Sequence, residues 1–146
     1  MFPYAIYLND TNMKIRILLV FLIMFALKNT LVANESMNLY DFSFEDIDGN
    51  QVNLDKFTGK PILIVNTASR CGFTPQYADL QNLFLNYKNS DLTIIATTSN
   101  SFNQEYSDAE AIKQICLVNY GVGFITSSPM EVRGKNTHPI YGWIEK

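Results

Sequence analysis

Two short apolar runs on either side of a helical pattern constrain this chain more than any other feature of its sequence. The first, "PILIVNTA", extends from Pro61 to Ala68, and the second, "LTIIAT", extends from Leu92 to Thr97. Unbroken apolar runs predict strands that are buried on both faces, as in a parallel sheet. The segment between them places apolar residues at i, i+3, i+4 and i+7, which predicts one face of a helix. These residues are Leu80, Leu83, Phe84 and Tyr87. Strand, helix and strand at this spacing predict a βαβ unit with a right-handed crossover, and therefore an α/β fold.

Turn and capping signals delimit the elements around this unit. Residues 39–54, "LYDFSFEDIDGNQVNL", alternate apolar and polar side chains on either side of Asp48-Gly49. Asp-Gly between alternating runs predicts a β-hairpin at the N-terminal side of the domain. Thr74 fits the N-cap of the helix that follows the first strand, and Pro75 suits its first helical position.

The C-terminal third of the sequence predicts three further elements. The capping box "SDAE" predicts a second helix that starts at Ser107, with Glu110 reaching back to the cap, and that stops at Gly121. The segment "MEVRG", residues 130–134, predicts a short strand, and "HPIYGWIEK", residues 138–146, predicts the beginning of another helix.

The first 33 residues differ in character from the rest of the chain. Lys14 and Arg16 precede eleven consecutive apolar residues, 17–27, and the small Ala33 follows them. This order is typical of a secretory signal peptide, so we expect residues 1–33 to be removed. Residues 34–146 then form one exported domain, periplasmic or secreted, that is not stably inserted in a membrane. Translation from Met13 would give a more ordinary signal, and an uncleaved membrane anchor is the alternative, although eleven residues are short for a bilayer.

Charge and cysteine content exclude several classes of function. With a formal net charge of −3, the chain is not expected to bind nucleic acid, because phosphate binding needs a basic face. Two cysteines are too few for a zinc quartet or a disulfide scaffold. No metal, nucleotide or organic cofactor is indicated.

Cys71 lies where an α/β fold places its chemistry. It follows the carboxyl end of the first predicted strand and precedes the proposed helix cap by three residues. The free N–H groups of that helix and the neighbouring Arg70 both favour a thiolate, which is the nucleophilic form of cysteine. The alternative is an inert buried cysteine, since cysteine is among the most commonly buried residue types.

The position of the second cysteine distinguishes two kinds of redox chemistry. A dithiol loop like that of thioredoxin would have a cysteine at position 74, where this chain has Thr74. A single thiol with a distant second thiol, Cys116, suits a different cycle. In that cycle a thiolate attacks a peroxide and becomes a sulfenic acid, and the second thiol then condenses with it to form a disulfide.

Two segments around the cysteines resemble one known family. Residues 60–84, "KPILIVNTASRCGFTPQYADLQNLF", look like the active-site segment of the glutathione peroxidase family, and residues 116–124, "CLVNYGVGF", resemble the stretch that carries the resolving cysteine in its thiol-based members. The resemblance extends over residues 38–146. It implies a thioredoxin-like fold with a central mixed sheet flanked by helices and preceded by the hairpin.

The resemblance also implies the roles of the site residues and the partners. It makes Cys71 the peroxidatic residue and Cys116 the resolving residue of a thiol peroxidase that takes part in the response to oxidative stress. The substrate would be hydrogen peroxide or an organic hydroperoxide, and the reductant glutathione or a thioredoxin-like protein.

The sequence departs from the family pattern at several positions. Ser101 stands where the family has a catalytic glutamine, and a serine cannot supply the paired hydrogen bonds of an amide. Gln104 resembles a family loop residue without predicted chemistry. The family continues past Lys146 with a late strand, a late helix and a tryptophan–asparagine pair, so we expect the domain to be C-terminally incomplete. Trp143 is not that tryptophan and is predicted to be a packing residue, and His138, the only histidine, is predicted to be a surface residue.

These departures keep two other functions open. One is a catalytically inactive, truncated remnant of the same family. The other is a thiol–disulfide oxidoreductase, against which Thr74 argues because the loop cannot close its own disulfide.

Overall fold

The structure is a computed structural model that describes residues 37–146. The predicted signal peptide at residues 1–33 lies outside the described residues. Within residues 37–146, no helix combines the length and the apolar character needed to cross a membrane.

The described residues form short helices and strands that include the predicted hairpin, βαβ unit, second helix and C-terminal helix in the predicted order. The elements are η1 (Leu39–Asp41), β1 (Ser43–Glu45), β2 (Gln51–Asn53), η2 (Leu54–Phe57), β3 (Ile62–Thr67), η3 (Thr74–Gln76), α2 (Tyr77–Tyr87), β4 (Thr93–Thr98), α3 (Ala109–Lys113), η4 (Gln114–Asn119), β5 (Ile125–Thr126) and α4 (Pro139–Ile144). Among them, η1, η2 and η3 are 3₁₀ turns and η4 is a π-helix.

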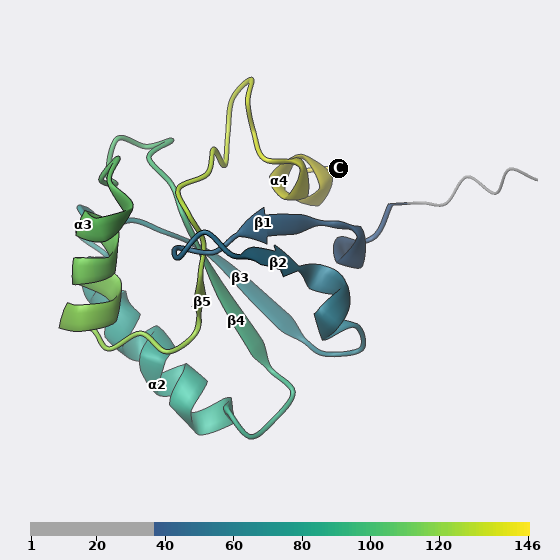
Figure 1. Ribbon diagram of the computed structural model, residues 1–146, viewed down its shortest axis with the longest axis horizontal. Coiled ribbons are helices and arrows are strands. Elements are labelled where there is room, and N and C mark those ends of the chain that lie inside the picture. Colours follow the sequence, from purple (N-terminus) through teal and green to yellow (C-terminus); the bar gives the residue numbers. More distant parts are fainter. Residues whose placement is uncertain (1–36) are drawn as a thin grey trace, which may run out of the picture. The chain divides into compact units, whose positions relative to one another are not determined.

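The predicted βαβ unit is confirmed. β3 and β4 pair in parallel from Ile62↔Thr93 to Thr67↔Thr98, and α2 connects them (Figure 1). β5 adds a second parallel pairing, which gives a sheet with the order β3-β4-β5. Parallel pairing aligns the carboxyl ends of β3 and β4 at one edge of this sheet, so the loops that follow the two strands begin side by side.

The prediction of a strand at residues 130–134 is wrong. The strand of this region is β5, residues 125–126, which the sequence did not indicate. Ser127 and Met130 continue along β4 by donating their N–H groups to the carbonyls of Ala96 and Thr98. Val132 then donates its N–H to the hydroxyl of Ser101, so the segment bonds to a loop side chain in place of a strand ladder.

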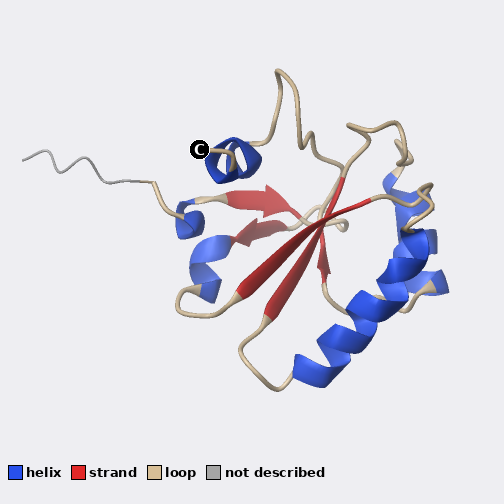
Figure 2. Cartoon of the chain, turned by 180° about the vertical axis from the view of Figure 1, so that it is seen from behind, coloured by secondary structure: helices blue, strands red, loops and turns tan. Residues whose placement is uncertain are grey.

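Alternating side chains of β3 and β4 divide the interior into two cores. Ile94 and Ala96 of β4 face one core, while Ile95 faces the other. Figures 1 and 2 show α2 and α3 on one side of the sheet and the hairpin and α4 on the other. The first core contains Leu63, Tyr77, Ile94, Ala96, Ile112, Cys116 and Phe124, and the second contains Phe42, Phe44, Leu54, Ile62, Ile64, Ile95 and Ile140.

The two sheet strands differ in how deeply they are buried. β4 is buried along almost its whole length, as the sequence predicts. The prediction that β3 is buried on both faces is wrong in degree, because its apolar residues 62–65 are only partly buried. β3 is the outer strand of the sheet within the described residues, so its side chains have strand neighbours on one side only.

The predicted hairpin is confirmed. β1 and β2 pair antiparallel around a turn in which Gly49 adopts a φ of 84°, a conformation that favours glycine. The Asp46 carboxylate fixes this turn by accepting the N–H groups of Asp48 and Asn50 at 2.9 and 2.8 Å. Asp46 also bridges to Ser127, which connects the hairpin to the end of β5.

The second helix begins one residue later than predicted. Asp108, and not Ser107, is its N-cap, because the Asp108 carboxylate accepts the N–H groups of Glu110 and Ala111. A carboxylate satisfies two of the free N–H groups at a helix start and interacts favourably with the helix dipole. The helix then widens into η4 and ends before Gly121, whose φ of 61° confirms the predicted stop.

The predicted C-terminal helix is confirmed as α4. His138 is its N-cap, with the ring nitrogen Nδ1 accepting the N–H of Ile140 at 3.4 Å. Trp143 is a packing residue, as predicted. Its ring lies 5.9 Å from that of Phe42, and its indole N–H donates to the carbonyl of Met37 at 2.8 Å.

The depth of the second core gives a stability prediction. Leu54 is 0% exposed and Leu85 is 47% exposed, so Leu54→Ala and Leu85→Ala remove the same atoms from contrasting environments. We expect Leu54→Ala to lower the free energy of unfolding by about 2–5 kcal/mol. Leu85→Ala should change it by no more than about 0.5 kcal/mol. Urea unfolding of both variants measures the difference, and equal midpoints would contradict this description of the core.

Candidate active site

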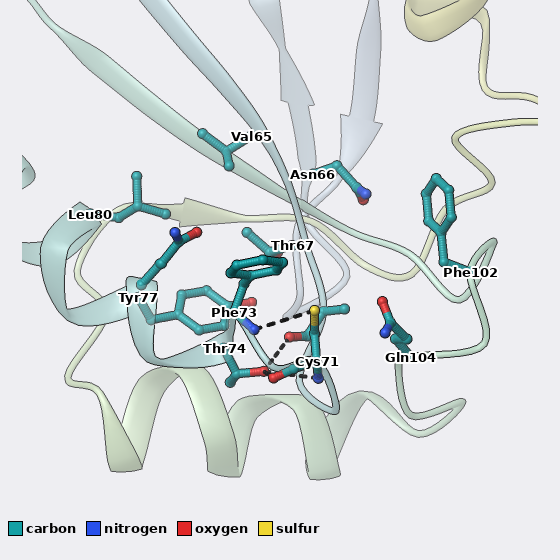
Figure 3. A pocket seen from close by; sticks show the side chains of 12 residues that line it. Val65, Asn66, Thr67, Cys71, Phe73, Thr74, Tyr77, Leu80, Phe102 and Gln104 are labelled. Atoms are coloured by element: carbon teal, nitrogen blue, oxygen red, sulfur yellow. Dashed lines mark hydrogen bonds between the residues drawn. The ribbon is translucent and has the colours of Figure 1, made fainter.

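Cys71 lies in the loop that leaves the carboxyl end of β3. The loop occupies residues 68–73 and leads through η3 into α2. Cys71 is partly exposed and borders a cavity of about 210 Å³ (Figure 3). The cavity is lined by Val65, Asn66, Thr67, Ala68, Cys71, Phe73, Thr74, Gln76, Tyr77, Leu80, Phe102 and Gln104. Its walls therefore combine apolar side chains with several amide and hydroxyl side chains.

The hydroxyl of Thr74 holds the loop together. Its Oγ1 accepts the N–H of Cys71 at 3.0 Å, and the carbonyls of Ala68 and Cys71 lie 2.9 and 2.7 Å from it. The prediction that Thr74 caps α2 is wrong. The N-cap is Gln76, without a side-chain hydrogen bond, and the 3₁₀ turn η3 precedes the helix. The hydroxyl is unavailable as a cap because it closes the Cys71 loop.

The groups closest to the thiol are backbone and aromatic. Phe73 donates its N–H to the Sγ atom of Cys71 at 3.5 Å, and its own ring is 72% exposed at the rim of the cavity. The guanidinium of Arg70 lies over the ring of Tyr106, 5.3 Å from the ring centroid. A backbone donor therefore faces the sulfur, whereas the charge of Arg70 is directed to an aromatic ring.

A second loop, residues 99–106, binds the Cys71 loop from the neighbouring strand. Gln104 accepts the N–H of Arg70 on its carbonyl at 2.8 Å. The Glu105 carboxylate accepts the N–H of Ser69 on both oxygens at 3.1 Å, and one of these oxygens also accepts the N–H of Tyr106 at 2.9 Å. Burial raises the pKa of the Glu105 carboxyl, and these N–H groups offset part of the rise. Sequence reasoning missed Glu105, because nothing in "NSFNQEYSD" indicates that its carboxylate is buried.

Cys116 has the opposite surroundings to Cys71. It lies on the π-helix η4, is 0% exposed, and packs in the same core as Tyr77, a residue that also lines the Cys71 cavity. Burial raises the pKa of the Cys116 thiol, and the nearby charge of Glu105 adds to the rise. Both cysteines are free thiols, and Cys116 does not line the cavity. The structure therefore does not bring the two predicted site residues together.

Gln104 lines the cavity, whereas Ser101 and His138, which were also considered from the sequence, do not. Ser101 donates its hydroxyl to the carboxylate of Glu131 at 2.7 Å and accepts the N–H of Val132 at 3.0 Å, and its neighbour Phe102 lines the cavity in its place. His138 is partly buried, which lowers its pKa, and it lines a different depression beside β1. The described residues contain no group of three or more histidine, cysteine or acidic side chains placed to hold a metal.

The role of Thr74 can be tested with a change that keeps the shape of the side chain. Thr74→Val removes the hydroxyl and leaves the N–H of Cys71 without its acceptor, at a cost of about 1–3 kcal/mol. We expect lower stability in urea and faster amide exchange at Cys71 by NMR. Thr58→Val is the control, because its hydroxyl bonds only to the Asp55 carbonyl in an exposed turn. Equal amide exchange at Cys71 in both variants would contradict the role of Thr74.

The contrast between the cysteines predicts their order of modification. Iodoacetamide should label Cys71 in the native reduced protein at least about a hundredfold faster than Cys116. Alkylation requires an accessible thiolate, and the Cys116 thiol is both buried and held protonated. Peptide mass spectrometry over a time course measures both sites. Comparable rates at neutral pH would show that Cys116 is not held inside the fold.

Comparisons with known proteins agree with this geometry. The profile of the family described as "Glutathione peroxidase" matches residues 39–145. A glutathione peroxidase of Lactococcus lactis is 40% identical over 75% of this chain and 71% of its own length. A glutathione peroxidase homolog of Neisseria meningitidis is 40% identical over 75% of this chain, which spans only 62% of that protein.

Solved structures support the same assignment. The crystal structure of Trgpx in its apo form is 30% identical, with a TM-score of 0.58 over 76% of this chain and 65% of that one. A secreted Mycobacterium tuberculosis disulfide oxidoreductase, at 14% identity and a TM-score of 0.52 over 63% of each chain, shares the fold alone. The predicted thioredoxin-like fold is confirmed by these neighbours. The matched profile, the relatives and the placement of Cys71 together show that this chain belongs to the glutathione peroxidase family.

Proposed function

We propose that this protein is a thiol peroxidase in which Cys71 reacts with the peroxide and Cys116 resolves the product. The observation that carries the proposal is the position of Cys71. Cys71 is partly exposed beside a small cavity of mixed polar and apolar lining, and its thiol receives a backbone N–H, in a chain that belongs to a family named for peroxidase activity. Such a site admits a small oxidant to a nucleophile held in a fixed loop.

The first step of the proposed reaction oxidises Cys71. Its thiolate attacks one oxygen of the peroxide, and the O–O bond breaks. The sulfur becomes a sulfenic acid, and the other oxygen leaves with a proton as water or an alcohol. The N–H of Phe73, 3.5 Å from Sγ, is placed to stabilise the thiolate before attack.

The second step of the proposed reaction forms a disulfide. The Cys116 sulfur attacks the sulfur of the Cys71 sulfenic acid, and a water molecule leaves. Cys116 is fully buried in the reduced structure, so η4 has to open locally before the sulfurs meet. Because of this requirement, we expect the buried Cys116 thiol to react more slowly than the accessible Cys71 thiol.

The reductant proposed for this disulfide is a thioredoxin-like dithiol protein, with glutathione as the other candidate. A dithiol reduces an enzyme disulfide in two exchange steps and leaves as a disulfide itself. Cys116 favours this route, because it converts the oxidised enzyme into a disulfide substrate. An exported protein of this kind, as residues 1–33 predict, would remove peroxides outside the cytoplasm as part of the response to oxidative stress.

Variants of each cysteine test the proposal. Wild-type protein, reduced and full length, should consume hydrogen peroxide or tert-butyl hydroperoxide much faster than a free thiol does, and Cys71→Ser should abolish this. Cys116→Ser should still consume one equivalent and accumulate a Cys71 sulfenic acid that dimedone traps. Stopped-flow kinetics and intact-protein mass spectrometry give both results. Absence of a Cys71–Cys116 disulfide in peroxide-treated wild type would refute the resolving role of Cys116.

The surroundings of Ser101 favour the alternative function, a catalytically inactive remnant of the family. Ser101, at the position of the family glutamine, bonds to Glu131 and does not line the Cys71 cavity. If peroxide consumption is no faster than that of glutathione alone, the chain keeps the family fold without its activity.

A further inference from the structure

Glu105 is a buried carboxylate that is bonded to the backbone two residues before Cys71. Its side chain is 3% exposed, and both of its oxygens accept the N–H of Ser69. The adjacent Gln104 carbonyl accepts the N–H of Arg70, and the Arg70 guanidinium lies over the Tyr106 ring. Three consecutive residues, 104–106, thus hold the two residues that directly precede the reactive thiol.

Burial disfavours the ionised form of Glu105. No lysine, arginine or histidine of the described residues forms an ion pair with Glu105. Burial raises the pKa of its carboxyl, so the folded state holds the proton more tightly than the unfolded state does. The contribution of Glu105 to stability therefore falls as pH rises from the unfolded to the folded pKa. A carboxylate that is buried without an ion pair and bonded to the Cys71 loop points to a role at the site.

We propose that Glu105 is a positioning residue for Cys71, and that the reactivity of Cys71 depends on the Glu105 carboxylate remaining ionised. This inference rests on the proposed function only in taking Cys71 as the reacting thiol. An ionised carboxylate accepts hydrogen bonds on both oxygens, whereas protonation of Oε2 removes one of the two acceptors of the Ser69 N–H and leaves Oε1 to accept from both Ser69 and Tyr106. Protonation therefore loosens the loop at Ser69.

The loop transmits this change to the sulfur over a short distance. Ser69 and Arg70 are held by residues 104 and 105, and the N–H of Cys71 is held by Thr74. With both ends fixed, the N–H of Phe73 faces Sγ at 3.5 Å. Release of the first end lets Cys71 shift relative to this donor and to the cavity, and small displacements of a reacting group are costly for rate.

Few other titratable groups lie near Glu105, so the effect of its titration on Cys71 can be separated from theirs. Tyr77 of α2 and Cys116 of η4 both lie within its electrostatic influence, and burial raises the pKa of each. Both groups are neutral in the acid range. A second transition on the acid side of the pH profile of Cys71 reactivity therefore reports the titration of Glu105.

The test is the pH profile of Cys71 reactivity in wild type, Glu105→Gln and Glu110→Gln. Rate constants for hydrogen peroxide and for iodoacetamide are measured from about pH 4.5 to 8, with circular dichroism confirming that each protein stays folded. In wild type, the logarithm of the rate should fall with a slope of about one at first and about two below the pH where Glu105 titrates. Carboxyl ¹³C NMR locates that titration independently.

The variants separate positioning from general stability. Glu105→Gln should slow Cys71 on the order of 10- to 100-fold at neutral pH and keep a slope of about one throughout. Glu110→Gln, an exposed carboxylate on α3, should match wild type. A Glu105→Gln profile identical to wild type overturns the proposal. If that variant does not fold, the wild-type profile decides, and a single slope of about one overturns the proposal.

The two reagents distinguish this inference from the peroxidase proposal. Iodoacetamide kinetics that follow Glu105, without fast peroxide consumption, would support the positioning role and refute the peroxidase. Fast peroxide consumption whose rate does not depend on Glu105 would support the peroxidase and refute the positioning role.

Discussion

The parallel pairing of β3 with β4 is the constraint on which the rest of the structure depends. β4 is buried on both faces, so its alternating side chains require cover from two layers, which α2 and α3 supply on one side and the hairpin and α4 on the other. The pairing ends at Thr67↔Thr98, which starts both following loops at the same edge. The Cys71 loop and the Glu105 loop are neighbours for this reason, although more than thirty residues separate them in the sequence.

The elements with a strong periodic or turn signal could be predicted from the sequence. β3, α2, β4 and the hairpin follow from apolar runs, a helical repeat and Asp48-Gly49, and the placement of Cys71 at a strand end follows from them. β5 could not be predicted, because two residues carry no period and their strand conformation depends on pairing with β4. The cap at Asp108 differs from the prediction by one residue, since Ser and Asp both suit that position and backbone geometry decides between them.

The least predictable part of the site is its polar network. Thr74 fits an N-cap by sequence, yet its hydroxyl closes the loop with Cys71 and Ala68. Glu105 occupies a polar stretch without a pattern that indicates burial, and it is buried where its carboxylate meets Ser69 on the loop of another strand. Side-chain bonds of this kind depend on tertiary neighbours. Neither composition nor local pattern contains that information.

The π-helical form of η4 has a consequence for how this region tolerates changes in chain length. A π-turn contains about one residue more than an α-turn, so a helix with a π-segment can lose a residue there and return to the α form. Within the helix that carries Cys116, residues 114–119 should therefore tolerate the deletion of one residue best. A deletion in α3 would instead rotate Ile112 away from the core that it fills. Homologous chains that differ by one residue in this helix should therefore differ at the π-segment, with the remainder of the helix in register.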